Sequence, residues 1–161
     1  MNWRSCPSSQ IQISLKKSRR VVARRISLDV KNKYQHIIEL QVRDYECDMQ
    51  GIVNNAVYQN YLEHARHDFL RTMNIDFVDL HKSGIDPVLI RSEIDYIYSL
   101  RSPEKFIIGS RILLENKVRM IFIQDIFGLP RNTLILNARM TAICLKKGRP
   151  VRLPWEFLKL V

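Results

Sequence analysis

Polar and hydrophobic residues alternate at the start of the body of this chain. Ile38, Leu40 and Val42 occupy every second position, and polar or charged residues fill the positions between them. A period of two is typical of a strand with one buried face. The pattern predicts a first strand over residues 36–45.

After Gly51 the hydrophobic period changes from two residues to three and four. This spacing indicates one amphipathic helix over residues 55–73, because it places the apolar side chains on a single face. Asn54 is the expected N-cap, since its side chain can accept a hydrogen bond from a free amide of the first turn. The apolar positions are Val57, Tyr58, Tyr61, Leu62, Ala65, Phe69 and Leu70.

The rest of the chain has the pattern of strands in series. A loop containing Gly84 and Pro87 follows the helix, and turn signals such as Ser102-Pro103 separate the later segments. The sequence predicts an α+β domain over residues 34–161, in which an antiparallel sheet of about five strands wraps around one long central helix. The four later strands are expected at residues 88–98, 105–115, 118–127 and 133–145.

Charge is concentrated at the start of the chain. The net charge is +10, and residues 1–33 account for +8 of it, with nine Lys and Arg against the single acid Asp29. The body carries only the remaining +2. Because attraction to nucleic acid needs cationic side chains clustered on a folded face, no nucleic-acid groove is expected in the domain.

Residues 1–33 form a basic leader rich in serine, expected to be disordered or barely attached. This composition is typical of an organelle transit peptide. A start codon assigned upstream of the true start would give the same composition, and nucleic-acid binding by this tail is a third interpretation. The compartment is therefore expected to be the cytoplasm, or an organelle if the leader is a transit peptide.

Cysteine and histidine spacing gives no sign of a metal centre or a disulfide framework. The three cysteines, Cys6, Cys47 and Cys144, have no C-x-x-C spacing, and His64 and His67 lack a third ligand in register. No apolar run approaches the length of a membrane span. We therefore expect no metal, no cofactor and no membrane insertion.

Residues 43–55 carry the candidate chemistry. They join the end of a strand to the start of a helix, where unpaired backbone N–H groups stabilise negative charge. A carbonyl held there would be polarised, and Asp48 can act on it as a general base or as a nucleophile. If the strand continued, Asp44 and Glu46 would lie on the same side and raise the pKa of neighbouring acids. The alternative is a solvated acidic loop whose carboxylates only stabilise the N-terminus of the helix through its dipole.

The run D-M-Q-G-I-V-N-N-A-V-Y at residues 48–58, continued by Q-N-Y-L-E-H-A-R, resembles the signature of the 4-hydroxybenzoyl-CoA thioesterase family. This is a branch of the hotdog superfamily, and the run is most similar to plant acyl-lipid thioesterases and small bacterial homologues with a D-x-x-G-x-V-N-N-x-x-Y pattern. The resemblance implies hydrolysis of acyl-CoA or acyl carrier protein thioesters to free acid and thiol. It also implies a homodimer or homotetramer with sites between subunits.

The resemblance assigns roles to individual positions. It implies that Asp48 is the catalytic acid, as base or nucleophile, and that the Gly51, Ile52 and Val53 backbone forms an oxyanion hole that binds the substrate. It places Asn54 and Asn55 at the helix start and implies that Asn55 is one of the catalytic residues. Tyr58 is the substrate-binding aromatic that follows.

Two further residues are candidates outside this run. Glu63 falls on a helical acid implicated in catalysis on other branches of the family, although an ion pair with Arg66 at i, i+3 is the structural alternative. Arg149 lies in a basic turn that can hold the phosphates of coenzyme A or the acidic surface of a carrier protein, or can simply be solvated.

Two rival functions remain at this stage. A hotdog hydratase acting on enoyl thioesters would use an Asp and His pair, but Ile52 precedes V-N-N and the run contains no histidine. A non-catalytic sensor of acyl thioesters would bind without turnover. A purely structural interaction domain leaves the D-x-x-G-x-V-N-N run without a role.

Overall fold

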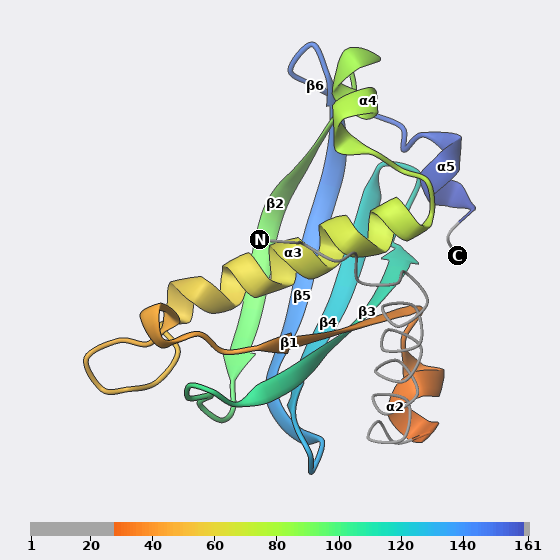
Figure 1. Cartoon of the computed structure of the whole chain (residues 1–161). Helices are drawn as coiled ribbons and strands as arrows, with labels where there is room; N and C mark the ends of the chain where they lie inside the picture. The colour runs from red at the N-terminus through yellow and green to blue at the C-terminus, as the bar shows by residue number, and fades with distance from the viewer. Residues whose placement is uncertain (1–27, 160–161) are drawn as a thin grey trace, which may run out of the picture.

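The computed structural model describes residues 28–159, which form one curved antiparallel sheet around one long helix (Figure 1). The strand order is β1-β3-β4-β5-β2, and β6 pairs with the end of β5. β1 and β2 therefore form the two edges of the main sheet. The strands are β1 (His36–Gln41), β2 (Asp86–Tyr96), β3 (Lys105–Leu114), β4 (Arg119–Gly128), β5 (Thr133–Lys146) and β6 (Arg149–Val151).

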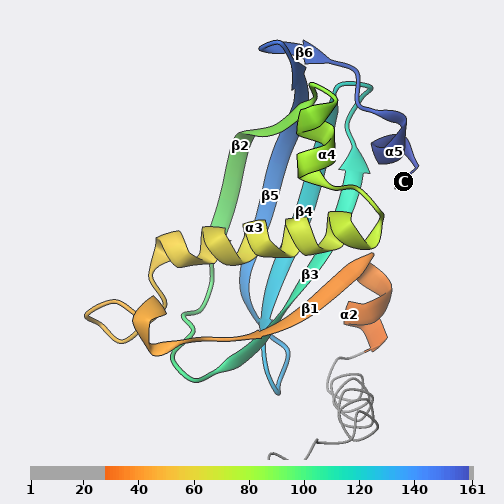
Figure 2. The ribbon, with the colours of Figure 1, turned by 45° about the horizontal axis from the view of Figure 1, so that its top comes forward.

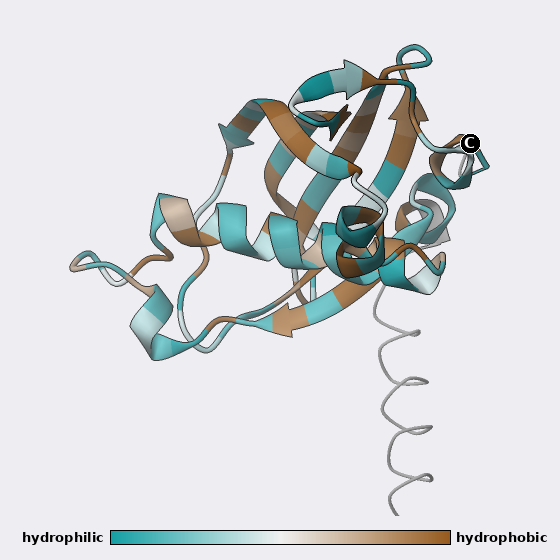
Figure 3. Ribbon diagram, turned by 90° about the horizontal axis from the view of Figure 1, so that it is seen from above, coloured by the Kyte–Doolittle hydropathy of each residue, from teal (hydrophilic) through white to brown (hydrophobic). Residues whose placement is uncertain are grey.

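Helix α3 (Asn55–Thr72) lies across the concave face of the sheet, as the two views in Figures 1 and 2 agree. Leu62 and Phe69 of α3 and Phe106 and Ile108 of β3 are all at most 2 % exposed. Burial of each such side chain contributes about 1.5–3 kcal/mol. Figure 3 shows hydrophobic stretches along the strands that curve around the helix. The predicted helix and its Asn54 cap are confirmed, and so is the predicted α+β plan.

The first strand is shorter than predicted. β1 ends at Gln41, and Asp44–Glu46 form a 3-10 helix, η1, instead of continuing the strand to Tyr45. The Glu46 side chain turns back to the backbone and guanidinium of Arg43, which ends the extended conformation. The predicted alignment of Asp44, Glu46 and Asp48 along one strand face is therefore wrong.

Short elements at the other end of the sheet also differ from the prediction. Residues predicted as loop contain helix α4 (Phe77–Lys82), whose first turn is capped by Asp76 through Val78 N–H. β6 was not predicted. Near the end of the described residues, the short helix α5 (Trp155–Leu158) follows Pro154 and is not one of these differences. None of the helices in the described residues is both long enough and apolar enough to cross a membrane.

The last residues of the predicted leader are ordered. Helix α2 (Leu28–Lys33) places Val30 against a small hydrophobic cluster of Tyr34, Ile107 and Phe127 on the convex face of the sheet. Lys33 Nζ lies 3.0 Å from the Asp125 carboxylate. The end of the predicted leader thus contains helix α2, and residues 1–27, on which the transit-peptide interpretation rests, lie outside the described residues.

Candidate active site

A compact loop carries the chain from β1 to α3. Cys47 and Val53 form an isolated antiparallel bridge, and between them Gly51 N–H donates to the Asp48 carbonyl at 2.9 Å. Gly51 has a φ of +70°, a backbone conformation that residues with a Cβ adopt rarely. Arg101 Nη1 donates to the Gly51 carbonyl at 3.2 Å from the segment after β2. The loop is therefore held from within and from a second element.

Glu46 anchors this loop to α3. Its carboxylate is buried and accepts hydrogen bonds from Arg43 N–H at 2.7 Å, Arg43 Nη1 at 2.9 Å and Tyr61 Oη at 2.5 Å. Burial acts to raise the pKa of Glu46, but these hydrogen bonds outweigh it and lower the pKa. Asp44 instead accepts from Ser102 Oγ. Asp44 and Glu46 thus have separate hydrogen-bond partners.

Asp48 is half-buried at the tip of the loop. Its Oδ1 accepts from Gln50 N–H at 2.8 Å and, at the long distance of 3.5 Å, from Ile52 N–H. Within the described residues, Oδ2 has no hydrogen-bond partner. One oxygen therefore fixes the carboxylate while the other is available to water or to a carbonyl carbon.

The start of α3 leaves one donor free beside this carboxylate. Asn54 Oδ1 accepts from Ala56 N–H at 2.9 Å, and the Asn54 carbonyl accepts from Val57 N–H at 3.0 Å. Within the described residues, Asn55 N–H has no acceptor. Gly51 N–H is already bonded to the Asp48 carbonyl, and Val53 N–H donates to the Leu100 carbonyl at 2.9 Å. The predicted oxyanion donors Gly51 and Val53 are thus occupied, and Ile52 N–H lies 3.5 Å from Asp48 Oδ1. Asn55 N–H, which was not among the predicted donors, is left for a ligand.

Asp48 and Asn55 face a common hollow of about 430 Å³. Tyr58 also lines this hollow, and its buried hydroxyl accepts from Leu100 N–H at 2.9 Å. Burial raises the pKa of Tyr58, so the phenol is neutral, and its hydrogen bond holds the ring against the segment between β2 and β3 that contains Leu100. The hollow is lined by Asp48, Ile52, Val53, Asn55, Tyr58, Tyr96, Ile97, Tyr98 and Ser99.

The far wall of this hollow was missed from the sequence. Tyr96 is the last residue of β2, and Ile97 and Tyr98 follow it. The Tyr96 hydroxyl donates to the Asn55 carbonyl at 3.3 Å. These three large hydrophobic side chains are unusually exposed, at 48 %, 43 % and 62 %. Alternation along the strand explains part of this exposure but gives no sign that the segment meets the helix start, because that contact spans more than forty positions.

Two predicted site residues lie elsewhere in the chain. Glu63 is two turns along α3, exposed, with Oε1 3.8 Å from His67 Nε2 rather than in the predicted pair with Arg66. Arg149 lies on β6, which pairs with the end of β5 remote from Thr133, whereas Tyr96 pairs with Leu136 near its start (Figure 1). Within one chain, neither residue reaches Asp48. Across the described residues, no three His, Cys, Asp or Glu side chains gather as a metal site.

Comparison with known proteins identifies the family. A sequence profile described as "Thioesterase-like superfamily" matches residues 42–161, which include the whole Asp48 loop, α3 and the strands β2 to β6. The chain belongs to the thioesterase-like superfamily. The family resemblance predicted from residues 48–66 is confirmed.

Two plant proteins are similar to this chain over most of its body. The chain is 42 % identical over 120 residues to the acyl-acyl carrier protein thioesterase ATL3, chloroplastic, of Arabidopsis thaliana, covering 74 % of this chain and 63 % of that protein. It is 43 % identical to ATL2, chloroplastic, with coverage of 74 % and 64 %. The chain therefore spans just under two thirds of the length of these relatives.

A solved structure shares the architecture. A 1,4-dihydroxy-2-naphthoyl-CoA thioesterase from Synechocystis superposes with a TM-score of 0.74 at 16 % identity, covering 77 % of this chain and 93 % of that one. At this identity the likeness shows the fold alone. The fold is the predicted hotdog, a sheet wrapped around one central helix.

Proposed function

We propose that this protein hydrolyses acyl thioesters at the hollow beside Asp48. The observation that carries the proposal is the juxtaposition of the unpartnered Asp48 Oδ2 and the unpartnered Asn55 N–H at one hollow. The carbonyl oxygen of a bound thioester would accept a hydrogen bond from Asn55 N–H, and the partial positive charge of the α3 N-terminus would stabilise negative charge on it. The names of the plant relatives support acyl thioesters as the substrate class.

Asp48 then acts in one of two ways. As a general base it takes a proton from water, the water oxygen bonds to the acyl carbon, and the carbon–sulfur bond breaks to release the thiol. As a nucleophile it bonds to the acyl carbon, the carbon–sulfur bond breaks to expel the thiolate, and water hydrolyses the resulting mixed anhydride in a second step. Rapid-quench kinetics separate the two, because only the second route accumulates an acyl-enzyme before steady state.

The test is steady-state thiol release from a panel of acyl-CoA and acyl carrier protein thioesters. Asp48→Asn should lower kcat by roughly a hundredfold or more. Asp44→Asn is the matched control, since Asp44 belongs to the same loop but bonds Ser102 and lies outside the hollow. Equal turnover by wild type and Asp48→Asn would refute the assignment. Binding of these thioesters without thiol release by the wild type would replace the hydrolase with a sensor.

We also propose that two copies pair along β2. This eleven-residue strand is an edge of the sheet, and Leu89 and Ile90 on it are 43 % and 48 % exposed. A long exposed edge favours pairing with a second strand. In an antiparallel pair, the Pro87 end of one β2 lies beside the partner's Tyr96 end, so that each copy would border the hollow of the other. Ile90→Lys should give a monomer by light scattering, whereas wild type gives a dimer.

The leader is proposed to direct the protein to an organelle. The basic, serine-rich composition of residues 1–33 supports this, together with the word chloroplastic in the names of both plant relatives. Residues 1–33 fused to a fluorescent protein should accumulate in plastids of transfected plant cells. Diffuse cytoplasmic fluorescence would instead favour the cytoplasm.

A further inference from the structure

Arg101 contacts the Asp48 loop from the segment between β2 and β3. Its Nη1 atom donates to two successive carbonyl oxygens of that loop, to Gly51 at 3.2 Å and to Gln50 at the long distance of 3.5 Å. Both acceptors are backbone groups, and Arg101 is not among the residues that line the hollow. One guanidinium nitrogen therefore holds two peptide units of the loop without entering the hollow.

These two contacts determine where two N–H groups point. In a trans peptide unit the C=O and the N–H point in opposite directions. Gly51 N–H shares its unit with the Gln50 carbonyl and donates to the Asp48 carbonyl at 2.9 Å. Ile52 N–H shares its unit with the Gly51 carbonyl and lies 3.5 Å from Asp48 Oδ1. Arg101 thus contacts one side of both peptide units, and Asp48 lies on the other side.

The backbone that carries Arg101 is itself fixed. Arg101 N–H donates to Glu104 Oε2 at 2.8 Å, and the Arg101 carbonyl accepts from Glu104 N–H at 2.8 Å. The preceding residue, Leu100, accepts from Val53 N–H and donates to the Tyr58 hydroxyl, both at 2.9 Å. The guanidinium therefore reaches the loop from a backbone that is bonded to the loop and to α3.

We propose that Arg101 is a positioning residue for the Asp48 carboxylate. Gly51 has a φ of +70° and lacks a Cβ, so the two peptide units on either side of it rotate more easily than those of other residues. Arg101 opposes this rotation and keeps both N–H groups directed at Asp48. The inference rests on the proposed function, in which the free Oδ2 acts on water or on the acyl carbon, and misplacement of such a group lowers kcat.

The geometry also predicts which replacement preserves the role. Because Nη1 alone makes both contacts, the planar fork of the guanidinium is not required. A Lys ammonium has three donors on one nitrogen and can bond two carbonyls. Met has an unbranched apolar side chain and no donor. Arg101 is exposed, so both substitutions should leave the fold intact.

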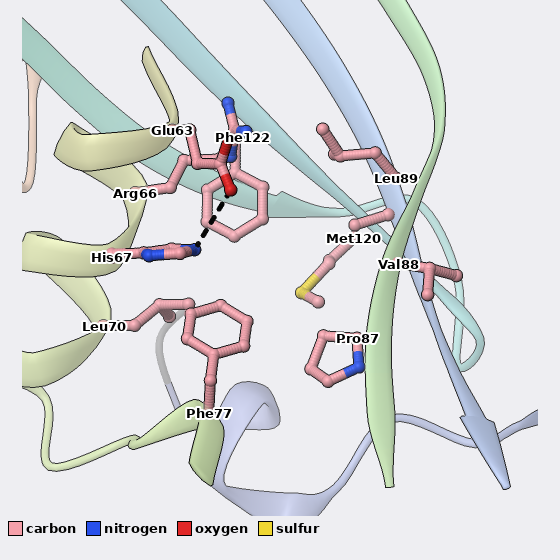
Figure 4. Close-up of a pocket in the computed structure, with 11 residues that line it drawn as sticks. Glu63, Arg66, His67, Leu70, Phe77, Pro87, Val88, Leu89, Met120 and Phe122 are labelled. Atoms are coloured by element: carbon pink, nitrogen blue, oxygen red, sulfur yellow. Dashed lines mark ion pairs between the residues drawn. The ribbon is translucent and has the colours of Figure 1, made fainter. Parts of the chain in front are cut away.

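The first test is steady-state thiol release from an acyl-CoA. Arg101→Met should lower kcat roughly tenfold to a hundredfold, with KM unchanged within about twofold, because placement of Asp48 affects the reaction rather than binding. Arg101→Lys should retain most of kcat. Arg131→Met is the matched control, because it removes an exposed arginine of the β4–β5 turn that does not line the hollow. Arg66 is no suitable control, because it is 7 % exposed and lies beside the cavity in Figure 4.

The second test does not depend on activity. Amide hydrogen exchange of Gly51, followed by NMR, reports how often its hydrogen bond to the Asp48 carbonyl opens. Exchange should be roughly tenfold faster in Arg101→Met than in wild type, because the loop loses a charge-assisted contact. Arg101→Lys and Arg131→Met should exchange at the wild-type rate.

Four outcomes would overturn the role of Arg101. These are unchanged Gly51 exchange in Arg101→Met, faster exchange with unchanged kcat, a loss in Arg101→Lys as large as in Arg101→Met, and a raised KM at constant kcat. The last would mean that the guanidinium binds the anionic substrate directly. Faster exchange in a protein whose wild type releases no thiol would support the hold of Arg101 on the loop and reject the hydrolase.

Discussion

The Tyr61 hydroxyl donates a 2.5 Å hydrogen bond to the Glu46 carboxylate, and this contact joins α3 to the loop that carries Asp48. The Glu46 carbonyl also accepts from Asn54 N–H at 3.1 Å, at the cap of the helix. Glu46 thus sets the position of the loop relative to the helix start. The relative placement of Asp48 and Asn55 depends on a residue that does not line the hollow.

Glu46→Gln should destabilise the fold and reduce turnover together. The amide keeps one acceptor but brings an N–H₂ group to a position surrounded by donors, so about 1–3 kcal/mol of unfolding free energy should be lost at pH 7. Urea unfolding measures this loss. Activity should fall through kcat, because the carboxylate and the donor are no longer held at a fixed separation.

The effect of Glu46→Gln should depend on pH. The folded-state pKa of Glu46 is below its ordinary value of 4.5, so ionised Glu46 stabilises the fold above pH 4.5, and this contribution is lost as the pH falls through the folded-state pKa. The stability difference between wild type and variant should shrink below pH 4.5. A difference that stayed constant from neutral to acid pH would show that ionisation of Glu46 plays no part.

Tyr58→Phe should destabilise the fold, because it removes one buried hydrogen bond beside the hollow. The substitution leaves Leu100 N–H buried without an acceptor, which costs about 1–3 kcal/mol. Tyr45→Phe is the matched control, because Tyr45 is 80 % exposed and such changes stay within about 0.5 kcal/mol. Urea unfolding of both variants, with KM for an acyl-CoA, tests the prediction. Equal stability of the two variants would contradict it.

The strongest periodic signals predicted the fold well. The helix was predicted over residues 55–73 and is observed at Asn55–Thr72, because its apolar spacing and its Asn54 cap are both local. The strand β3, predicted over 105–115, is observed at Lys105–Leu114. The missed helix α4 carried a usable local signal, Asp76 as cap before Phe77 and Leu80, which the nearby Gly84 and Pro87 obscured.

The site could be predicted only as far as local sequence reaches. Asp48, Asn55 and Tyr58 lie within one short segment and one resemblance, and all three line the hollow. The wall at Tyr96 and the anchor between Glu46 and Tyr61 depend on contacts distant in sequence. Strand alternation placed Glu46 beside other acids, but tertiary hydrogen bonds determine its actual surroundings.

Gly109→Ala should be strongly destabilising on the convex face. A Cβ at this position would lie 2.5 Å from Tyr34 Cδ2, so either the ring or the strand must shift, at about 1–3 kcal/mol. In the Tyr34→Ala background the same substitution should lose most of this effect. A double-mutant cycle by urea unfolding measures the coupling, and additive losses would mean that the ring does not occupy this position.

The last prediction concerns which N-terminal residues the stable domain needs. Deletion of residues 1–27 keeps α2, Lys33 and Tyr34, and the thermal unfolding midpoint should stay close to that of the full chain. Deletion of residues 1–34 removes the Tyr34 and Lys33 partners of the buried Asp125 carboxylate and uncovers Ile107 and Phe127. Loss of these partners and of the apolar contacts should cost several kcal/mol and lower the midpoint by roughly 10 °C or more.

Asp125→Ala separates the two causes of that loss. In the chain that lacks residues 1–34, Asp125→Ala should recover part of the midpoint, because it removes a buried carboxylate that no longer has its partners. In the chain that starts at residue 28, the same substitution should lower the midpoint, because Tyr34 and Lys33 lose their acceptor. Opposite signs in the two backgrounds, measured by calorimetry, would place the start of the stable domain at α2. An equal midpoint for both truncations would place it after Tyr34.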